Sequence, residues 1–406
     1  MTASFKQPWL SIIGIGEGGV IDLAPQARHV LDHAKLIVGG ERHLNFVEPY
    51  KCEKFRWPSP IVDALPFLLQ HRGTPVVVLA SGDPFHYGIG ALLAQHIPSE
   101  EMVSFTSPSA FSLAASALKW SQQDCALISL HGRAFEQIIP LLQPNARILA
   151  LSWDESTPKK LAALLVDRSL GQSEVHVLEN LGGEKARHRF SHAQDFDLHD
   201  ISPLNLVALH VRADARAEFI PNTPGLPDQW FENDGQITKR EIRAITLSAL
   251  APKQGELLWD IGAGSGSISI EWLLQHPSNQ AIAVEKNSAR AAQIKHNASK
   301  MGAPHLEIIL SEAHLCLEGL RQPNAIFIGG GASPELLHKC WAALPIGGRL
   351  VINAVTLETQ SLLAQTYQQL GGDLTQIQIS RAKPVGSFHG LEPSMAIHQW
   401  AAIKTN

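Results

Sequence analysis

The stretch LLWDIGAGSGSISIEW, residues 257–272, decides the fold of the second half of the chain. An apolar run ends in Asp260, and glycines at positions 262, 264 and 266 follow before a helical pattern begins. This order predicts a strand, a tight turn and a helix whose first backbone N–H groups can face a nucleotide-like ligand. A buried strand that leads through a glycine turn into a helix is typical of an α/β fold with a parallel sheet.

The spacing of these glycines distinguishes two kinds of nucleotide-binding loop. The dinucleotide fingerprint GxGxxG needs its third glycine at position 267, where this chain has serine, so the spacing is GxGxG. Glu285 ends the next predicted strand, 21 residues after Gly264, where a carboxylate can accept hydrogen bonds from both hydroxyls of a ribose. A tight βα turn without any ligand is the simpler alternative.

Asp260–Gly266 together with Glu285 resemble the S-adenosylmethionine (SAM) site of class I methyltransferases. The resemblance spans most of residues 235–406 and implies a Rossmann-like domain. It also implies that SAM contacts the following residues: Thr238, Gly262, Ala263, Gly264, Ser265, Gly266, Glu285 and Ala313.

A second glycine cluster, GIGEGG at residues 14–19, does satisfy GxGxxG. By itself it favours a dinucleotide site. In the dinucleotide fold, however, the helix opens inside the motif. Here VID follows the last glycine, and we expect the next helix to begin near Leu23, with Asp22 as its N-cap and Pro25 in its first turn.

The stretch VVVLASGDPFHYGIG, residues 76–90, reads as a buried strand followed by a Gly-Asp-Pro turn and small residues. Alone, such a turn is an ordinary strand exit. Together with GIGEGG before it, and SPSAF and SLHGR after it, the stretch resembles the tetrapyrrole (precorrin) methylases, in which SAM lies between two α/β lobes. The resemblance implies that the first glycine loop lies on the substrate side. It further implies that SAM contacts these residues: Gly82, Asp83, Ser109, Ala110, Asn180 and Leu181.

Strand-like and helix-like patterns alternate along most of the chain. From residue 9 to about 211 this alternation predicts a parallel sheet covered by helices, two of them at residues 59–72, with Ser59 as N-cap and Pro60 at N1, and at residues 109–120. The pattern breaks over residues 212–236, which hold three prolines, and then restarts.

We therefore expect an α/β chain with two domains. A two-lobed tetrapyrrole methylase domain is predicted at residues 1–212, a linker at 213–225 and a Rossmann-like class I methyltransferase domain at 226–406. The last domain is expected to close with antiparallel stretches near residues 373–382 and 394–404.

The composition is that of a globular protein. The 406 residues are 45% hydrophobic and 17% charged, and the net charge of −5 with no long Lys/Arg run argues against a nucleic-acid partner. Four cysteines, none in CxxC spacing, predict buried thiols of a reducing compartment and no metal site. The first residues lack a leader pattern and no stretch is long and apolar enough to span a membrane, so we expect a cytoplasmic protein without a membrane partner.

The pairing of the two domains resembles a bifunctional methyltransferase family of cobalamin biosynthesis. The resemblance implies that the first domain methylates precorrin-6Y at C5, and that the second methylates it at C15 and decarboxylates its C12 acetate arm, giving precorrin-8. It implies one SAM per domain, a tetrapyrrole partner and a homo-oligomer, while no catalytic base is singled out. Because the substrate carries many carboxylates, basic residues near the pockets are candidates to bind it: Arg133, Lys239, Arg240 and Arg243.

Other functions fit parts of the same sequence. The chain could be a SAM methyltransferase of another substrate, with its N-terminal half as a non-catalytic tetrapyrrole or substrate-binding module. An NAD-dependent oxidoreductase built on GIGEGG is a second alternative. In a third, one SAM site is vestigial and that half only sequesters the tetrapyrrole.

Overall fold

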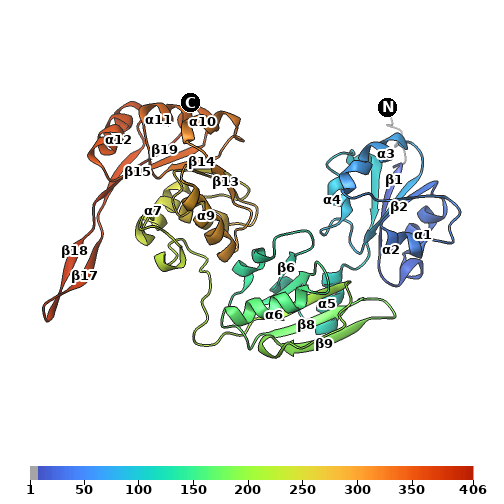
Figure 1. Ribbon diagram of the computed structural model, residues 1–406. Coiled ribbons are helices and arrows are strands. Elements are labelled where there is room, and N and C mark those ends of the chain that lie inside the picture. Colours follow the sequence, from blue (N-terminus) through green and yellow to red (C-terminus); the bar gives the residue numbers. More distant parts are fainter. Residues whose placement is uncertain (1–7, 406) are drawn as a thin grey trace. The chain divides into compact units, whose positions relative to one another are not determined.

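The computed structural model describes residues 8–405 and divides the chain into two units. Unit 1 comprises Met1–Arg133 with Gln143–Glu218, and unit 2 comprises Ala134–Leu142 with Phe219–Asn406. Figure 1 draws most of unit 1 in blue and green and most of unit 2 in yellow to red. The first seven residues, on which part of the leader prediction rests, lie outside the described residues.

The first lobe of unit 1 contains a five-stranded parallel sheet in the order β3-β2-β4-β1-β5. Val76 and Val78 of β4 pack into a cluster on one face of this sheet, and Val77 and Leu79 pack into a cluster on the other. The apolar run of β4 is therefore buried on both faces, as a central parallel strand requires. The elements are β1 (Leu10–Ile15), α1 (Pro25–Asp32), β2 (Leu36–Gly39), α2 (Glu41–Phe46), β3 (Glu53–Arg56), α3 (Leu65–Gln70), β4 (Val76–Ser81), α4 (Ile89–Leu93) and β5 (Met102–Phe105).

The second lobe of unit 1 has a sheet in the order β6-β7-β10-β8-β9. β6 and β7 are parallel, whereas β10 is antiparallel to β7 and β8, and β8 is antiparallel to β9. The predicted parallel sheet is thus right for the first lobe and wrong for the second, where a short turn at residues 180–186 can join only antiparallel neighbours. The elements are α5 (Ala110–Leu118), β6 (Cys125–Ser129), β7 (Arg147–Leu151), α6 (Thr157–Asp167), β8 (Glu174–Glu179), β9 (Arg187–His192) and β10 (Asn205–His210).

Two predicted helix starts in unit 1 are wrong. Gly19–Asp22 form a 3₁₀ turn, and α1 begins at Pro25, so Asp22 is not its N-cap. The expected helix at residues 59–72 begins only at Leu65, after another 3₁₀ turn. Pro66 explains this later start, because proline lacks an N–H and is tolerated in the first turn of a helix but not in its interior.

Unit 2 is built on a seven-stranded sheet in the order β13-β12-β11-β14-β15-β19-β16. Its strands are parallel from β13 to β15, and β19 is antiparallel to both β15 and β16, which confirms the predicted alternation and antiparallel ending. The elements are α7 (Arg240–Leu250), β11 (Leu257–Ile261), α8 (Ser267–Leu274), β12 (Gln280–Glu285), α9 (Ser288–Lys300), β13 (Glu307–Leu310), α10 (Ala313–Cys316), β14 (Ala325–Ile328), α11 (Pro334–Ala343), β15 (Arg349–Ala354), α12 (Leu357–Leu370), β16 (Asp373–Ile377) and β19 (Ile397–Ile403).

A β-hairpin that the sequence reading missed projects from unit 2 (Figure 1). It consists of β17 (Ser380–Val385) and β18 (Phe388–Pro393), whose residues are nearly all exposed. Gly386 and Ser387 form the two-residue connection, and Gly386 has a φ of +61°. A Gly-Ser pair between two extended runs is a known hairpin signal.

All four cysteines are free thiols, and Cys340 is the one that is fully buried. Within residues 8–405, no helix is long and apolar enough to cross a membrane. The same residues contain no group of three or more His, Cys, Asp or Glu side chains that could hold a metal ion.

Candidate functional site

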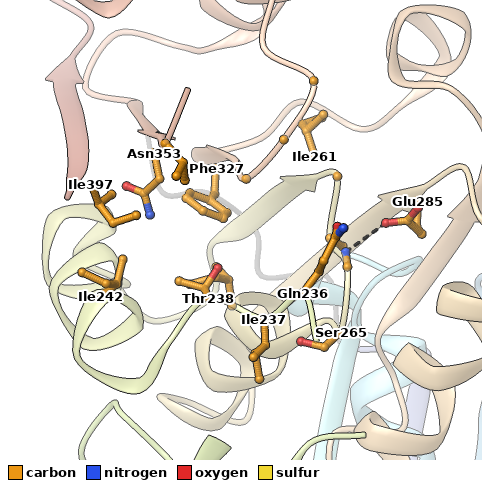
Figure 2. A pocket seen from close by; sticks show the side chains of 18 of the residues that line it. Gln236, Ile237, Thr238, Ile242, Ile261, Ser265, Glu285, Phe327, Asn353 and Ile397 are labelled. Carbon is orange, nitrogen blue, oxygen red and sulfur yellow. Dashed lines mark hydrogen bonds between the residues drawn. The ribbon is translucent and has the colours of Figure 1, made fainter. Parts of the chain in front are cut away.

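Unit 2 has a cavity of about 1010 Å³ at the carboxyl ends of its parallel strands (Figure 2). This volume lies at the upper end of the range of about 300–1,000 Å³ that small-molecule sites occupy. The cavity is lined by the glycine loop after β11, by the loops after β12, β14 and β15, by residues 235–239 and by residues at the base of the hairpin. Ligands of open α/β sheets bind at this edge.

The glycine loop leaves its backbone open to this cavity. Gly262, Gly264 and Gly266 all have positive φ angles, of +68°, +59° and +73°. A side chain on Gly262 would place its Cβ 3.0 Å from the carbonyl oxygen of Gly330. Gly266 packs against Ile294 of α9 and does not line the cavity, unlike the four residues before it: Gly262, Ala263, Gly264 and Ser265.

Glu285 closes the loop from the end of β12. The backbone N–H of Gly264 donates to Glu285 Oε2, and that of Asn287 donates to Oε1, both at 2.9 Å. Figure 2 marks the bond to the loop with a dashed line. The side chain is 4% exposed and lines the cavity. Each carboxylate oxygen keeps one lone pair, so the group can accept hydrogen bonds from two neighbouring hydroxyls.

Two polar groups under the loop are incompletely satisfied. Asp260 Oδ2 accepts hydrogen bonds from the backbone N–H and the hydroxyl of Ser269, whereas its Oδ1 is buried without a partner among the described residues. Burial raises the pKa of the Asp260 carboxyl to about 6, and the nearby Glu285 adds to the shift. Ser265 Oγ is likewise buried without a partner, and Ser265 lines the cavity, so a ligand would satisfy it.

Arg243 fixes the segment before α7, which forms the cavity wall that faces the glycine loop. Its guanidinium donates to the carbonyl oxygens of Thr238 and Leu226 and forms ion pairs with Glu271 at 2.5 Å and Asp228 at 3.1 Å. Arg243 is 0% exposed, so the prediction that it binds a substrate carboxylate is wrong. Sequence cannot show that Glu271, 28 positions away, neutralises it. Thr238 itself lines the cavity.

The end of the cavity away from Glu285 is mostly apolar, with one oriented amide (Figure 2). Ile242, Phe327 and Ile397 surround Asn353 there. Asn353 Nδ2 donates to Thr246 Oγ1 at 2.9 Å, and its Oδ1 accepts a hydrogen bond from Gln399 Nε2 at 2.9 Å. These bonds leave Asn353 one N–H and one lone pair for a ligand.

Basic side chains line the cavity on several sides, and Arg381 faces an acidic partner. Arg381 of β17 forms an ion pair with Glu241 of α7, and both side chains are half exposed. Lys239 lines the cavity, whereas Arg240 is exposed and is not one of the lining residues. The basic lining residues are Lys239, Lys286, Arg290 and Arg381, and Ala313 also lines the cavity.

In unit 1, three loops meet at the carboxyl edge of the first sheet. Ser107 Oγ donates to the Gly14 carbonyl at 2.7 Å, and the Ser107 N–H donates to the Gly82 carbonyl at 3.2 Å. The Gly82 N–H donates in turn to the Ile15 carbonyl at 3.3 Å. Gly82 has a φ of +55°, and the backbone of Ser109 lies directly against it.

Asp83 lies in the Gly-Asp-Pro turn, where its Oδ1 accepts a hydrogen bond from the Phe85 N–H at 2.8 Å, and the other predicted contacts of unit 1 lie near α5. Ser109 is the N-cap of α5, because its Oγ accepts a hydrogen bond from the Ser112 N–H at 3.2 Å, and Ala110 is the first residue of the helix. Leu181 packs against the core cluster that α5 forms with the second sheet, and Ala110 packs there too. Asn180 precedes Leu181 with a φ of +48°. The structure thus groups Gly82 with Ser109, and Ala110 with Leu181.

An aromatic surface adjoins the Gly-Asp-Pro turn. The rings of His86, Tyr87 and Phe111 contact one another: the His86 centroid lies 5.4 Å from that of Tyr87 and 4.7 Å from that of Phe111, and the other two lie 6.0 Å apart. The Arg133 guanidinium lies over the Tyr87 ring at 4.9 Å. Phe85 and Tyr87 are 48% and 44% exposed. A flat conjugated ligand could stack on such a surface, beside a cation able to meet a carboxylate.

Several polar residues at the carboxyl edges of the unit 1 and unit 2 sheets were not predicted from the sequence. Asn353 and Arg381 reach the cavity of unit 2, and Arg42 and His43 lie at the sheet edge of unit 1. The available signal was position: Asn353 is near the end of a predicted strand, and Arg42 and His43 follow one closely. Carboxyl ends of parallel strands share one edge, so such residues can be expected near a ligand.

Comparisons with known proteins agree with the two units. The profile of the tetrapyrrole (corrin/porphyrin) methylases matches residues 10–197, and that of a precorrin methyltransferase domain matches residues 229–404. The chain is 47% identical to a precorrin-6Y C(5,15)-methyltransferase (decarboxylating) of Sinorhizobium sp, over 98% of this chain and 97% of that protein. It is 36% identical to a Mycobacterium tuberculosis protein of the same name, over 97% and 99% of the two chains. A solved C-terminal domain of precorrin-6Y C5,15-methyltransferase from Rhodobacter capsulatus is 43% identical, covers 46% of this chain and 100% of its own, and has a TM-score of 0.44.

Proposed function

The chain belongs to the family of decarboxylating precorrin-6Y C(5,15)-methyltransferases, and we propose that it uses two SAM sites, one in each unit, on one tetrapyrrole substrate. Precorrin-6Y is methylated at C5 and C15 and loses the carboxyl group of its C12 acetate arm, giving precorrin-8 in cobalamin biosynthesis. The first domain, residues 1–212, methylates C5. The second, residues 226–406, methylates C15 and removes the carboxyl group, and residues 213–225 link the two. The two matched profiles, over residues 10–197 and 229–404, support this division.

The cavity of unit 2 is the observation that carries the proposal. Glu285 is oriented by two backbone N–H groups and retains acceptor capacity for the two ribose hydroxyls of SAM. Ser265 Oγ, buried and unpartnered among the described residues, supplies a further polar contact. Thr238, Ala313 and the backbone of Gly262–Ser265 line the same cavity and complete the proposed SAM contacts, whereas Gly266, also predicted, packs behind the loop.

SAM, when bound, supplies a methyl group that its positively charged sulfur makes electrophilic. The apolar residues Ile242, Phe327 and Ile397 keep water away from the reacting end of the cavity, which lowers the cost of bringing charge together there. Asn353, fixed by Thr246 and Gln399, orients the substrate beside them. The conjugated macrocycle provides the nucleophilic carbon and accepts the electron pair that CO₂ leaves behind.

In unit 1, SAM is held by Gly82 and Asp83, by Ser109 and Ala110, and by the loop at Asn180–Leu181. The close approach of Gly82 to Ser109 and the packing of Leu181 with α5 support this grouping. The exposed rings of Phe85 and Tyr87 stack on the macrocycle, and Arg133 binds one of its carboxylates. In unit 2, Lys239 and Arg381 bind carboxylates of the macrocycle, and Arg381 does so beside Glu241. The exposed Arg240 binds carboxylates only outside the cavity.

The hairpin of unit 2 supports the expectation of a homo-oligomer. Val385, Phe388 and Leu391 are 63%, 77% and 74% exposed on it. A two-stranded hairpin with apolar side chains in water is only marginally stable by itself, so contact with a second copy of the chain would stabilise it. Four free cysteines fit the reducing conditions of the cytoplasm, where we place the chain.

Calorimetric titration of the full chain with SAM tests the proposal. We expect two SAM molecules per chain. Glu285→Gln should weaken one site about 30-fold, about 2 kcal/mol, because the amide leaves a backbone N–H without its acceptor and meets a ribose hydroxyl with a poorer partner. Glu335→Gln, an exposed change on α11, is the control and should leave both sites unchanged.

A single SAM per chain in the wild type would overturn the two-site proposal, and the half without SAM would be a tetrapyrrole-binding module. With two sites established, incubation with precorrin-6Y and SAM should add two methyl groups and release one CO₂. Mass spectrometry reads all three changes in one product.

A further inference from the structure

A polar cluster at the carboxyl edge of the first sheet has no role in the function proposed above. It joins Glu17 of the first glycine loop, Arg42 and His43 of α2, and Ser81 at the end of β4. These residues follow or end β1, β2 and β4, which lie side by side in the sheet in the order β2-β4-β1. The cluster therefore ties the first glycine motif to the Gly-Asp-Pro turn.

The geometry of the cluster is tight. Arg42 Nη1 donates to Glu17 Oε1 at 2.5 Å, and Nη2 donates to Ser81 Oγ at 2.8 Å. His43 Nε2 lies 3.1 Å from Arg42 Nη2 and 2.9 Å from Ser81 Oγ. Ser81 Oγ is thus within hydrogen-bond distance of both a permanent cation and an imidazole nitrogen.

The neighbours of His43 fix where its proton is. A guanidinium can only donate, so His43 Nε2 beside Arg42 is the acceptor, and the ring proton is on Nδ1. His43 Nδ1 is buried without a partner among the described residues. Burial and the Arg42 charge lower the pKa of His43 to about 4, so the ring is neutral at pH 7. Nε2, the unprotonated nitrogen, lies 2.9 Å from Ser81 Oγ and can take a proton from the Ser81 hydroxyl.

We propose that Ser81 and His43 form the proton acceptor of the C5 methylation, an inference that rests on the proposed function of unit 1. The new bond to the methyl carbon uses an electron pair of the conjugated ring, and the electrons of the broken S–C bond stay on sulfur. The ring is left with a positive charge, and the methylated carbon still holds its hydrogen. When that C–H bond breaks, its electron pair restores the conjugation and the proton passes to Ser81 Oγ. The hydroxyl proton of Ser81 passes to His43 Nε2 and then to water.

The position and strength of this pair suit the step. Ser81 is exposed and directly precedes Gly82 and Asp83, the residues proposed to hold SAM. A cationic ring with a hydrogen on its methylated carbon is a strong acid, so a weak base is sufficient to accept the proton. Arg42 orients the Ser81 oxygen, and Glu17 fixes Arg42, which makes these two positioning residues.

The test uses the full chain and four variants: Ser81→Ala, Ser81→Thr, His43→Asn and His96→Asn. His96 is an exposed histidine of the same lobe and serves as the matched control. Ser81→Ala and His43→Asn should lower the rate of C5 methylation at least 100-fold, the lower limit for loss of general base catalysis. Ser81→Thr keeps the hydroxyl and should restore most of the rate, and His96→Asn should not change it.

Two readouts do not depend on turnover. Calorimetry should find the same number of SAM molecules per chain in all five proteins. ¹⁵N NMR of the imidazoles, with the His43 signals assigned by their absence from His43→Asn, should show the Nδ1–H form at pH 7. The Nε2 signal should shift in Ser81→Ala and return in Ser81→Thr.

The outcomes separate the inference from its premise. A wild type that adds no methyl at C5 would overturn the proposed function of unit 1. If the wild type does add it, and His43→Asn keeps the rate or loses SAM from unit 1, then the pair has no role as proton acceptor. A fifth variant, His86→Asn, covers the remaining case: if it loses C5 methylation while His43→Asn keeps a normal rate, the base lies on the aromatic surface and the proposed pair is overturned.

Discussion

Each unit has a glycine loop after its first sheet strand, yet the two loops contact different partners. In unit 2 the loop after β11 donates to Glu285 and opens onto a cavity of about 1010 Å³. In unit 1 the loop after β1 contributes Glu17 to a cluster with Arg42 and Ser81. A glycine loop therefore indicates that the backbone must approach something closely, and the residues on neighbouring strands decide what.

The glycines themselves differ in the same way. In unit 2 three glycines with positive φ angles shape the turn. In unit 1, Gly14 is close to other backbone: a Cβ on it would lie 1.8 Å from the carbonyl oxygen of Gly82. The first loop thus serves loop-to-loop packing. The loop of unit 1, which matches the GxGxxG fingerprint, packs against other loops. The loop of unit 2, which departs from that fingerprint, faces a cavity.

The largest effect should come from Gly14→Ala. The added methyl group would collide with backbone atoms of Gly82 and Ser107, which cannot rotate away, so we expect unit 1 to lose more than about 3 kcal/mol of stability. Gly16→Ala in the same motif is the control, because no atom lies within 4 Å of its Cβ position.

Scanning calorimetry of the full chain, together with SAM titration, checks this prediction. Gly14→Ala should lower the unfolding temperature of unit 1 and abolish its SAM binding, while unit 2 still binds one SAM. Equal behaviour of the two alanine variants would show that the loops do not pack as described.

The next effect is an opposite response of the two units to acid. The pKa of His43 is lowered from 6.5 to about 4, so its contribution to stability is present above pH 6.5 and is lost as the pH falls toward 4. The pKa of Asp260 is raised from 3.8 to about 6, so its contribution is present below about pH 4 and is lost as the pH rises through 6. At 1.36 kcal/mol per pKa unit, each of these shifts corresponds to about 3 kcal/mol.

The free energy of unfolding, measured between pH 7 and 4.5 for the wild type and for one variant of each group, checks both signs. His43→Asn should flatten the acid-induced loss of stability of unit 1. Asp260→Asn should be more stable than the wild type at pH 7, and this advantage should shrink as the pH falls. Parallel pH profiles for the wild type and both variants would contradict the assignment of these two groups.

Much of the fold could be predicted because periodicity reports burial directly. Continuous apolar runs such as Val76–Ala80 predict strands covered on both faces, and β4 is such a strand. The antiparallel pairing of the second lobe could not be predicted in this way, because it depends on which strands become neighbours. The hairpin after β16 does carry a local signal, the Gly-Ser turn at Gly386–Ser387.

The contacts in the candidate sites likewise divide into those that local sequence predicts and those that it does not. The backbone contacts of the loop at 262–265 follow from local sequence, and so does the bond to Glu285 at the next strand end. The burial of Arg243 does not, because it depends on Glu271 and on carbonyl groups of the segment before α7. Arg381 lies 140 positions from its partner Glu241, and no spacing rule connects the two.

The smallest effect concerns the charged lining of unit 2. Arg381 and Glu241 are both half exposed, and an exposed ion pair contributes only about 0.2–1 kcal/mol. If Arg381 exchanges Glu241 for a substrate carboxylate, Arg381→Ala should raise the KM of the C15 reaction about 3–5-fold without changing SAM affinity. Arg321→Ala, which removes an exposed pair with Glu307 outside the cavity lining, is the control.

The partner variant tells exchange from simple support of the hairpin. In an exchange, Glu241 competes with the substrate, so Glu241→Gln should lower the KM of the C15 reaction, opposite to Arg381→Ala. If the pair only fixes β17 beside α7, both variants lose the same contact and should raise KM together.

In unit 1, Arg133→Ala should raise KM for the C5 reaction alone, since Arg133 lies over Tyr87 in that unit. Both units would then recognise substrate carboxylates, although the contacts of their glycine loops differ.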